Sequence, residues 1–272
     1  MQRPAALPLD LTGRTVFVAG AGSAGPGWSI GRAASLTYAR LGAQVCVVDL
    51  DAPSAGETTA LIRAEGGIAE TFIGDVAHQA DVERLFAAAR ARFGSVDVLH
   101  HNVGIGKTGG PMETSAEDLD RIHGVNVRSL LLCSQQVLPG MVEQGRGAII
   151  AISSIAGMRY VGYPHLAYSV TKAAVTQFTR MVAQQYARHG IRANTVVPGL
   201  IDTPRIATTV ANMYSDTSLD EARRERARQV PLGRMGSAWE VAHACAFLAS
   251  DAAAYVTGTE LVVDGGITGK YV

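Results

Sequence analysis

A tyrosine and a lysine four residues apart, Tyr168 and Lys172, are the residues whose types and spacing most directly suggest chemistry. In a helix, residues four apart lie one turn apart on the same face. A lysine ammonium held near a phenol favours the phenolate, so a tyrosine so placed can exchange a proton well below its free pKa of roughly 10. Such exchange with an alcohol oxygen is general acid–base chemistry. An exposed surface pair is the alternative, so the prediction depends on a neighbouring cofactor site.

A glycine-rich segment between a strand and a helix predicts that cofactor site. The β-branched run 14–19 indicates a buried strand, and helical periodicity follows from 32 to 41. The segment between them, 20–31, reads GAGSAGPGWSIG. Glycines let backbone N–H groups approach a pyrophosphate, whose charge is favoured at a helix N-terminus. The context predicts a dinucleotide site rather than an ordinary loop.

An aspartate at the end of the next strand predicts which dinucleotide binds. The run 43–50 reads as a buried strand that carries Asp49 near its end. A carboxylate there accepts hydrogen bonds from the adenosine ribose hydroxyls and repels a 2′-phosphate. The next residues, Leu50 and Asp51, include no arginine that could bind such a phosphate. NAD is therefore predicted over NADP, and Asp51 is interpreted as the cap of the next helix.

Strands alternate with helices along the rest of the chain, mostly with short connections. The expected further strands are 69–73, 96–101, 148–153, 192–197 and 260–263. The expected further helices are 55–65, 78–93, 116–144 with breaks at Gly124 and Pro139, 167–189 and 238–250, with Ser115 as a cap. The polar, poorly periodic stretch 200–229 is predicted to be a flexible substrate flap. The pattern predicts one α/β domain over residues 1–272, a Rossmann-like doubly wound parallel sheet of about seven strands with helices on both faces.

Composition limits the partners. The chain is 47% apolar and 18% charged with a formal net charge of zero, which favours a globular protein with neither nucleic acid nor an anionic membrane as partner. Three separated cysteines without metal-site spacing indicate buried thiols in a reducing cytoplasm. No apolar run reaches the roughly 20 residues that span a bilayer, and residues 1–10 lack a signal-peptide pattern.

With these landmarks in place, the chain resembles the short-chain dehydrogenase/reductase family over essentially its whole length. Each landmark is weak alone, and together, in the family's order, they are specific. They are the turn 20–31, Gly74-Asp75-Val76, His101-Asn102-Val103-Gly104, Asn126, Ser154, Tyr168 with Lys172, and Pro198-Gly199. The turn is longer than the family's T-G-x-x-x-G-x-G, with Pro26-Gly27-Trp28 apparently inserted, so the glycine that contacts the pyrophosphate stays open. His101 replaces the family's first asparagine, and a structural and a functional role are both open.

The resemblance implies roles for these residues. Tyr168 would be the general acid/base, Lys172 would favour its phenolate and bind the nicotinamide ribose, and Ser154 would hold the substrate oxygen. Asn126 would anchor a water that relays protons to Lys172. Ser153, still on the strand, is expected to point into the fold instead. The residues expected to bind or line the cofactor are Gly20, Ser23, Ser29, Ile30, Gly31, Asp49, Leu50, Asp75, Val76, Asn102, Val103, Gly104, Tyr168, Lys172, Pro198, Gly199, Ile201 and Thr203.

The implied function is that of an NAD-dependent oxidoreductase, a homotetramer, that interconverts a small secondary alcohol and a ketone. A 3-oxoacyl-thioester reductase is the alternative in the same class, disfavoured because such reductases usually use NADPH. A non-catalytic dinucleotide-binding sensor is the alternative from another class, disfavoured because the four predicted catalytic residues are all present. The stretch 158–163 favours an aromatic or alicyclic substrate. Arg159 is either its carboxylate partner or, more simply, a surface residue, and His165 either contacts substrate or caps the helix.

Overall fold

The computed structural model describes residues 9–207 and 218–270, and one parallel sheet organises it. Seven strands lie in the order β3-β2-β1-β4-β5-β6-β9, and every pair is parallel. The strands are β1 (Thr15–Ala19), β2 (Gln44–Asp49), β3 (Ile68–Ile73), β4 (Val98–His101), β5 (Gly147–Ile152), β6 (Ile191–Pro198) and β9 (Glu260–Val263); β7 (Ile201–Asp202) and β8 (Gly236–Ser237) form a small second sheet. The predicted doubly wound Rossmann-like fold is confirmed.

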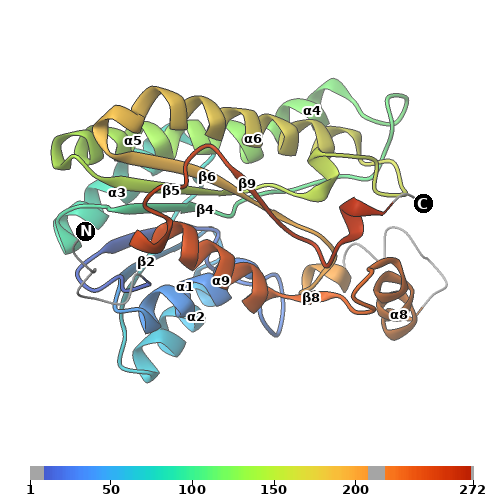
Figure 1. Ribbon diagram of the computed structural model, residues 1–272, viewed down its shortest axis with the longest axis horizontal. Helices are drawn as coiled ribbons and strands as arrows, with labels where there is room; N and C mark the ends of the chain where they lie inside the picture. The colour runs from blue at the N-terminus through green and yellow to red at the C-terminus, as the bar shows by residue number, and fades with distance from the viewer. Residues whose placement is uncertain (1–8, 208–217, 271–272) are drawn as a thin grey trace.

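Helices cover both faces of the sheet, which explains why most residues of its central strands are apolar and buried (Figure 1). One layer contains α1 (Ile30–Arg40), α2 (Ala52–Ala64) and α9 (Ala238–Ala249). The other contains α3 (Gln79–Phe93), α5 (Ser129–Gln144) and α6 (Leu166–Tyr186), with α4 (Ala116–His123) leading into it. Each layer buries its own core, and Phe17 of β1 stacks on Phe86 of α3 at 4.0 Å between ring centroids.

The order of the strands fixes where a ligand can bind. The chain runs outward from β1 to β3 and then crosses back to β4, which pairs with β1 on its other side. Because all strands are parallel, the loops after β1, β2, β4 and β5 open at one edge. In open α/β sheets, ligands bind at this edge, beside the point where the order reverses. Many of the predicted cofactor residues, and Ser154, follow these strands.

The helical segment 116–144 differs from the prediction. No break occurs at Pro139, because α5 runs on to Gln144. Val137 and Met141 on either side of the proline are buried against the sheet, and this packing outweighs the lost backbone hydrogen bond. At Gly124 the chain forms a π-helical turn, η1 (Gly124–Arg128), instead of a break. The segment is thus helical throughout.

The predicted flap over 200–229 falls partly on residues 208–217, which lie outside the described residues. Its described parts carry regular structure, since β7 pairs with β8 and α8 (Leu219–Gln229) begins after the cap Ser218. Within α8, Ala222 is the one buried residue, so the helix has no apolar stripe. A helix whose apolar contacts are limited to Leu219 and Ala222 leaves no clear periodic signal in the sequence.

Three further findings bear on chemistry and partners. Cys46, Cys133 and Cys245 are buried and free, as predicted, and burial raises the pKa of Cys46 and Cys133 to about 12. No group of three or more His, Cys, Asp or Glu side chains within 9–207 and 218–270 has a geometry that could hold a metal ion. None of the helices in the same ranges is long and apolar enough to cross a membrane.

Gly31, in the first turn of α1, sits where a side chain has no room. A Cβ there would lie 1.9 Å from the carbonyl oxygen of Gly20 and 2.8 Å from the side-chain nitrogen Nδ2 of Asn102. Gly31→Ala should therefore lower the free energy of unfolding by about 1–3 kcal/mol or more, as overpacking does. Gly56→Ala is the matched control, because the space around Gly56 of α2 is open. It should raise the free energy of unfolding by about 0.5–1 kcal/mol. Urea unfolding measures both, and a Gly31→Ala protein as stable as the wild type would contradict the close contact.

Candidate active site

A cleft of about 620 Å³ runs along the carboxyl ends of β1 to β4, and we call it the strand-end cleft. Most of the residues predicted to bind cofactor line it. They are Gly20, Ser23, Ser29, Ile30, Asp49, Leu50, Asp75, Val76, Asn102, Val103, Gly104 and Thr203. Gly31 is not among the lining residues, because it packs under the turn against Gly20. The predicted residues therefore converge from four separate strand ends.

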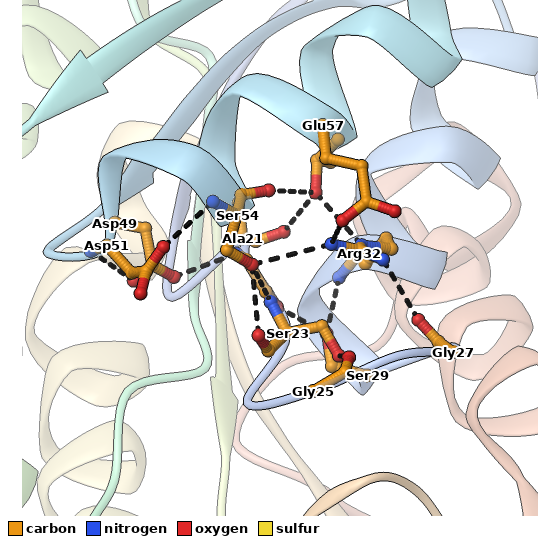
Figure 2. Close-up of polar contacts among 12 residues, drawn as sticks. Ala21, Ser23, Gly25, Gly27, Ser29, Arg32, Asp49, Asp51, Ser54 and Glu57 are labelled. Atoms are coloured by element: carbon orange, nitrogen blue, oxygen red, sulfur yellow. Dashed lines mark hydrogen bonds and ion pairs between the residues drawn. The ribbon is translucent and has the colours of Figure 1, made fainter.

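The turn 20–31 is held by its own polar groups (Figure 2). The Ser29 hydroxyl donates to the carbonyl of Gly22 at 2.5 Å and caps α1 by accepting from the N–H of Arg32 at 3.0 Å. The Ser23 hydroxyl donates to the carbonyl of Gly25 at 2.8 Å. Both hydroxyls thus stabilise the turn while their residues line the cleft, so a pyrophosphate would meet a preformed loop.

The inserted part of the turn is anchored from behind by Arg32 and lies close to Pro204. The buried Arg32 guanidinium donates to the carbonyl of Gly27 at 3.0 Å and pairs with Glu57 of α2 at 2.6 Å (Figure 2). A Cβ on Gly25 or Gly27 would lie 3.4 or 3.6 Å from Pro204, which follows β7. The extension therefore brings the turn into contact with the segment after β7.

Asp49 is fixed in the wall of the strand-end cleft. Its carboxylate accepts from the N–H of Gly22 at 2.8 Å and from the N–H of Asp51 at 3.1 Å. Asp51 caps α2 by accepting from the N–H of Ser54 at 2.8 Å, as predicted. Of the described residues that line the cleft, Arg205 is the single cation, and it donates to the carbonyl of Gly104 after β4, at 2.8 Å. The end of the cleft at β2 is thus acidic.

A second, smaller cleft of about 190 Å³ adjoins the first, and we call it the tyrosine cleft. The two share lining residues at their junction, including Asn102, Gly104, Thr203 and Arg205. Six further predicted site residues line the tyrosine cleft. They are Ser154, Tyr168, Lys172, Pro198, Gly199 and Ile201. Two clefts that meet at one point can hold a cofactor and a substrate side by side.

Lys172 lies buried beneath Tyr168 on α6. Its amine donates to the carbonyl of Ile152, the last residue of β5, at 2.8 Å, and lies 5.5 Å from the centroid of the Tyr168 ring. Burial, with a smaller contribution from the guanidinium of Arg205, lowers the pKa of Lys172 to about 7. Near neutral pH this amine can therefore both hold and release a proton.

The two serines after β5 point to different sides. Ser153 is buried, and its hydroxyl donates to the carbonyl of Lys172 at 2.7 Å, so it points into the fold as predicted. Ser154 is half-buried, accepts from the N–H of Ala156 at 3.2 Å and lines the tyrosine cleft. The serine predicted to hold a substrate oxygen is thus the one beside Tyr168.

Asn126 lies fully buried in the π-helical turn η1. Its side-chain carbonyl accepts from the N–H of Ile105 at 2.8 Å, and its amide donates to the carbonyl of Ile105 and the hydroxyl of Thr171, both at 2.9 Å. These bonds fasten the loop after β4 to α6, one residue before Lys172. The water relay implied for Asn126 stays a prediction, and the structure adds this positioning contact.

Three residues whose roles were open have clear places. His165 lines the tyrosine cleft and makes no capping bond; its ring stacks on Tyr168 at 4.5 Å, and burial chiefly lowers the pKa of His165 to about 4. His101 is buried at 2.8 Å from the Ser129 hydroxyl, and burial chiefly lowers the pKa of His101 to about 3, which indicates a neutral structural residue. Exposed Arg159 donates to the carbonyl of Thr268 at 2.6 Å and lines neither cleft.

Two arginines of the tyrosine cleft were not predicted from the sequence. Arg205 lines both clefts, and its position two residues after Thr203 is the one hint the sequence offers. Arg226 reaches the tyrosine cleft from α8, whose uniformly polar sequence distinguishes none of its arginines. Their place follows from the path of the chain after β7.

Comparisons with known proteins agree with this arrangement. A family model described as enoyl-(acyl carrier protein) reductase matches residues 24–268. The 2,5-dichloro-2,5-cyclohexadiene-1,4-diol dehydrogenase of Sphingobium indicum is 38% identical over 262 residues, 95% of this chain and 98% of the relative. The 2-(S)-hydroxypropyl-CoM dehydrogenase 3 of Xanthobacter autotrophicus is 37% identical over 245 residues, 90% and 94% of the two chains.

A solved dehydrogenase structure is also similar to this chain. The gluconate 5-dehydrogenase of Burkholderia cenocepacia J2315, in complex with NADP and tartrate, superposes with a TM-score of 0.85 at 29% identity, over 97% of this chain and 98% of its own. The chain belongs to the short-chain dehydrogenase/reductase family. It is an oxidoreductase of that family, whose members use a nicotinamide dinucleotide.

The buried amine of Lys172 should make stability depend on pH. Because the folded-state pKa of about 7 lies below the ordinary value of 10.5, the unfolded chain binds more protons between those values. The free energy of unfolding should therefore rise as pH increases from 7 to 10, by about 1–4 kcal/mol from this group. Lys172→Met should remove that rise and be more stable than the wild type at pH 7.

Urea unfolding at pH 7 and pH 10 measures the effect. Lys107→Met is the matched control, because Lys107 is exposed and pairs with Asp118 at the surface. Its stability should follow the wild-type pH dependence. Equal pH dependence of the wild type and Lys172→Met would show that the pKa of Lys172 is not lowered in the folded protein.

Proposed function

We propose that the protein is an NAD-dependent dehydrogenase that interconverts a secondary alcohol and a ketone. The observation that carries the proposal is the junction of the two clefts, where the hydroxyl-bearing residues Ser154 and Tyr168 face the space beside the strand-end cleft. Two hydroxyl groups and a buried amine beneath them suit a reacting alcohol oxygen. The named substrates of the two dehydrogenase relatives, a diol and a hydroxypropyl compound, are alcohols too.

In the proposed reaction, the alcohol loses a hydride from its carbinol carbon and a proton from its hydroxyl. The nicotinamide cofactor, when bound, supplies the hydride acceptor. Ser154 holds the substrate oxygen by a hydrogen bond, and Tyr168 accepts the hydroxyl proton. Lys172, whose pKa of about 7 lets it exchange a proton near neutral pH, stabilises the tyrosine in its deprotonated form. Asn126 holds the loop after β4 against α6 by hydrogen bonds to Ile105 and Thr171.

The residues of the strand-end cleft fit a dinucleotide, and those near Asp49 favour NAD. Asp49 is held by two backbone N–H groups on the cleft wall, and Asp51 lies beside it on the same wall. A 2′-phosphate at this end would meet two carboxylates. The gluconate 5-dehydrogenase neighbour binds NADP, so the preference rests on the residues of this chain alone.

The two alternatives have less support. A 3-oxoacyl-thioester reductase fits the acyl-carrier description of the family model, but the carboxylates at the end of β2 disfavour the NADPH that such reductases usually use. A non-catalytic sensor has no need for all four predicted catalytic residues, of which Ser154, Tyr168 and Lys172 line the tyrosine cleft and Asn126 is buried in η1. Oxidation of any alcohol of a cyclic, aromatic and sugar panel, followed as NADH absorbance, excludes the sensor.

The assembly and location are also proposals. Leu131, Val170 and Met181 expose 42, 51 and 45% of their surface on α5 and α6. Exposed apolar side chains on neighbouring helices favour an interface with other copies, and a homotetramer is the assembly that the family resemblance implies. Three free, buried thiols suit the reducing cytoplasm.

Replacement of the proposed acid/base tests the mechanism. Tyr168→Phe keeps the ring that stacks on His165 but removes the hydroxyl. We expect kcat to fall by about 100- to 10,000-fold, the usual contribution of general acid–base catalysis, while the NADH dissociation constant changes little. Steady-state kinetics and NADH fluorescence titration measure the two quantities. Turnover near the wild-type level would exclude Tyr168 as the acid/base.

Removal of the carboxylate at position 49 tests the cofactor preference. Asp49→Asn keeps an acceptor for the N–H of Gly22 but loses the charge. The ratio of kcat/KM for NADP to kcat/KM for NAD should rise by about tenfold or more, since repulsion of the 2′-phosphate is relieved. Glu65→Gln, an exposed carboxylate change at the end of α2, should leave the ratio unchanged. An unaltered ratio in Asp49→Asn would refute the assignment of NAD to this aspartate.

A further inference from the structure

The tyrosine cleft is lined by cations and by no acidic residue among those the structure describes. Lys172, Arg205 and Arg226 contribute the positive charge, and no Asp or Glu is found in the described lining. The rest of the wall includes apolar side chains, among them Val161, Leu200 and Ile206. A neutral alcohol would make no use of the two guanidinium groups in this lining.

Arg205 reaches the space where a substrate would lie. It donates to the carbonyl of Gly104 at 2.8 Å and lines both clefts at their junction. Its charge also makes a smaller contribution, after burial, to the lowered pKa of Lys172 and of His165, both of which line the same cleft. An anion in the tyrosine cleft would lie within the field of that charge.

Arg226 is the arginine of α8 that lines this cleft. Arg223, one turn earlier, pairs with Asp202 at 3.2 Å and with Asp220 at 3.4 Å. Arg228 pairs with Glu225 at 3.0 Å on the exposed surface. Among these three, Arg226 alone belongs to the cleft lining, and it enters from an element remote in sequence from Tyr168.

We propose that the substrate is a secondary alcohol that carries a carboxylate, and that Arg226, assisted by Arg205, binds that carboxylate. The proposal rests on the proposed function and adds the charge of the substrate to it. A guanidinium presents a planar set of donors that matches a carboxylate, and the attraction is stronger in a partly enclosed cleft than in water. The apolar wall would hold the carbon skeleton, and the volume of about 190 Å³ suits a small hydroxy acid.

Paired substrates that differ only in charge test the proposal. The probes are 4-hydroxycyclohexanecarboxylate and its neutral carboxamide, oxidised with saturating NAD. We expect kcat/KM for the carboxylate to exceed that for the amide by about 10- to 100-fold, the usual effect of a charge-assisted hydrogen bond. Arg226→Gln should abolish the difference, Arg226→Lys should retain part of it, and Arg228→Gln on the same helix should leave it intact. A preference that survives in Arg226→Gln overturns the role of Arg226.

A binding measurement separates this proposal from the proposed function. Calorimetric titration of the NADH-saturated protein with cyclohexanecarboxylate and with cyclohexanecarboxamide needs no turnover. The carboxylate should bind about tenfold or more tightly than the amide, and Arg226→Gln should erase the gain. Equal binding of the two probes, or no binding of either, overturns the carboxylate site even where alcohols are oxidised. Carboxylate-selective binding without oxidation of any alcohol would support the site and overturn the dehydrogenase.

Discussion

The hydrogen bond from the buried amine of Lys172 to the carbonyl of Ile152 is the contact on which the site depends. It joins the second turn of α6 to the last residue of β5, at 2.8 Å, and so sets the height of Tyr168 above the sheet edge. Burial of an amine is costly unless its donors are satisfied, so the strand end and the helix must stay in register. Ser154, two residues beyond Ile152, is thereby held beside Tyr168. The geometry of the tyrosine cleft is thus set by the packing of one helix on one strand.

The second constraint is the close approach of the loop after β4 to the side chains of Lys172 and His165, and this approach depends on two glycines. A Cβ on Gly104 would lie 2.9 Å from the amine of Lys172, and a Cβ on Gly106 would lie 2.5 Å from Nε2 of His165. The loop can therefore pass directly over the buried amine only because these positions have no side chain. Asn126 holds the loop there through both backbone polar groups of Ile105. The walls of both clefts meet at this loop, so its position determines their junction.

Much of this arrangement was predictable from the sequence, because it depends on local signals. Apolar β-branched runs give the strands, and a parallel sheet necessarily brings Asp49, Asn102 and Ser154 to one edge. What escaped prediction depends on tertiary packing. The helix continues through Pro139 because its neighbours are buried, and α8 forms without an apolar stripe. Arg226 reaches the tyrosine cleft only through the path of the chain after β7, which no local pattern encodes.

The charges of the two clefts are sorted, and this links the cofactor to the substrate. Asp49, Asp51 and Asp75 line the strand-end cleft after β2 and β3, whereas Lys172 and Arg226 line the tyrosine cleft and Arg205 lies where the two clefts meet. A dinucleotide without a 2′-phosphate places hydroxyls at the acidic end. A substrate with a carboxylate places its charge at the basic end. The two proposed requirements thus lie apart, because the acids follow β2 and β3 whereas the cations come from α6, α8 and the segment after β7.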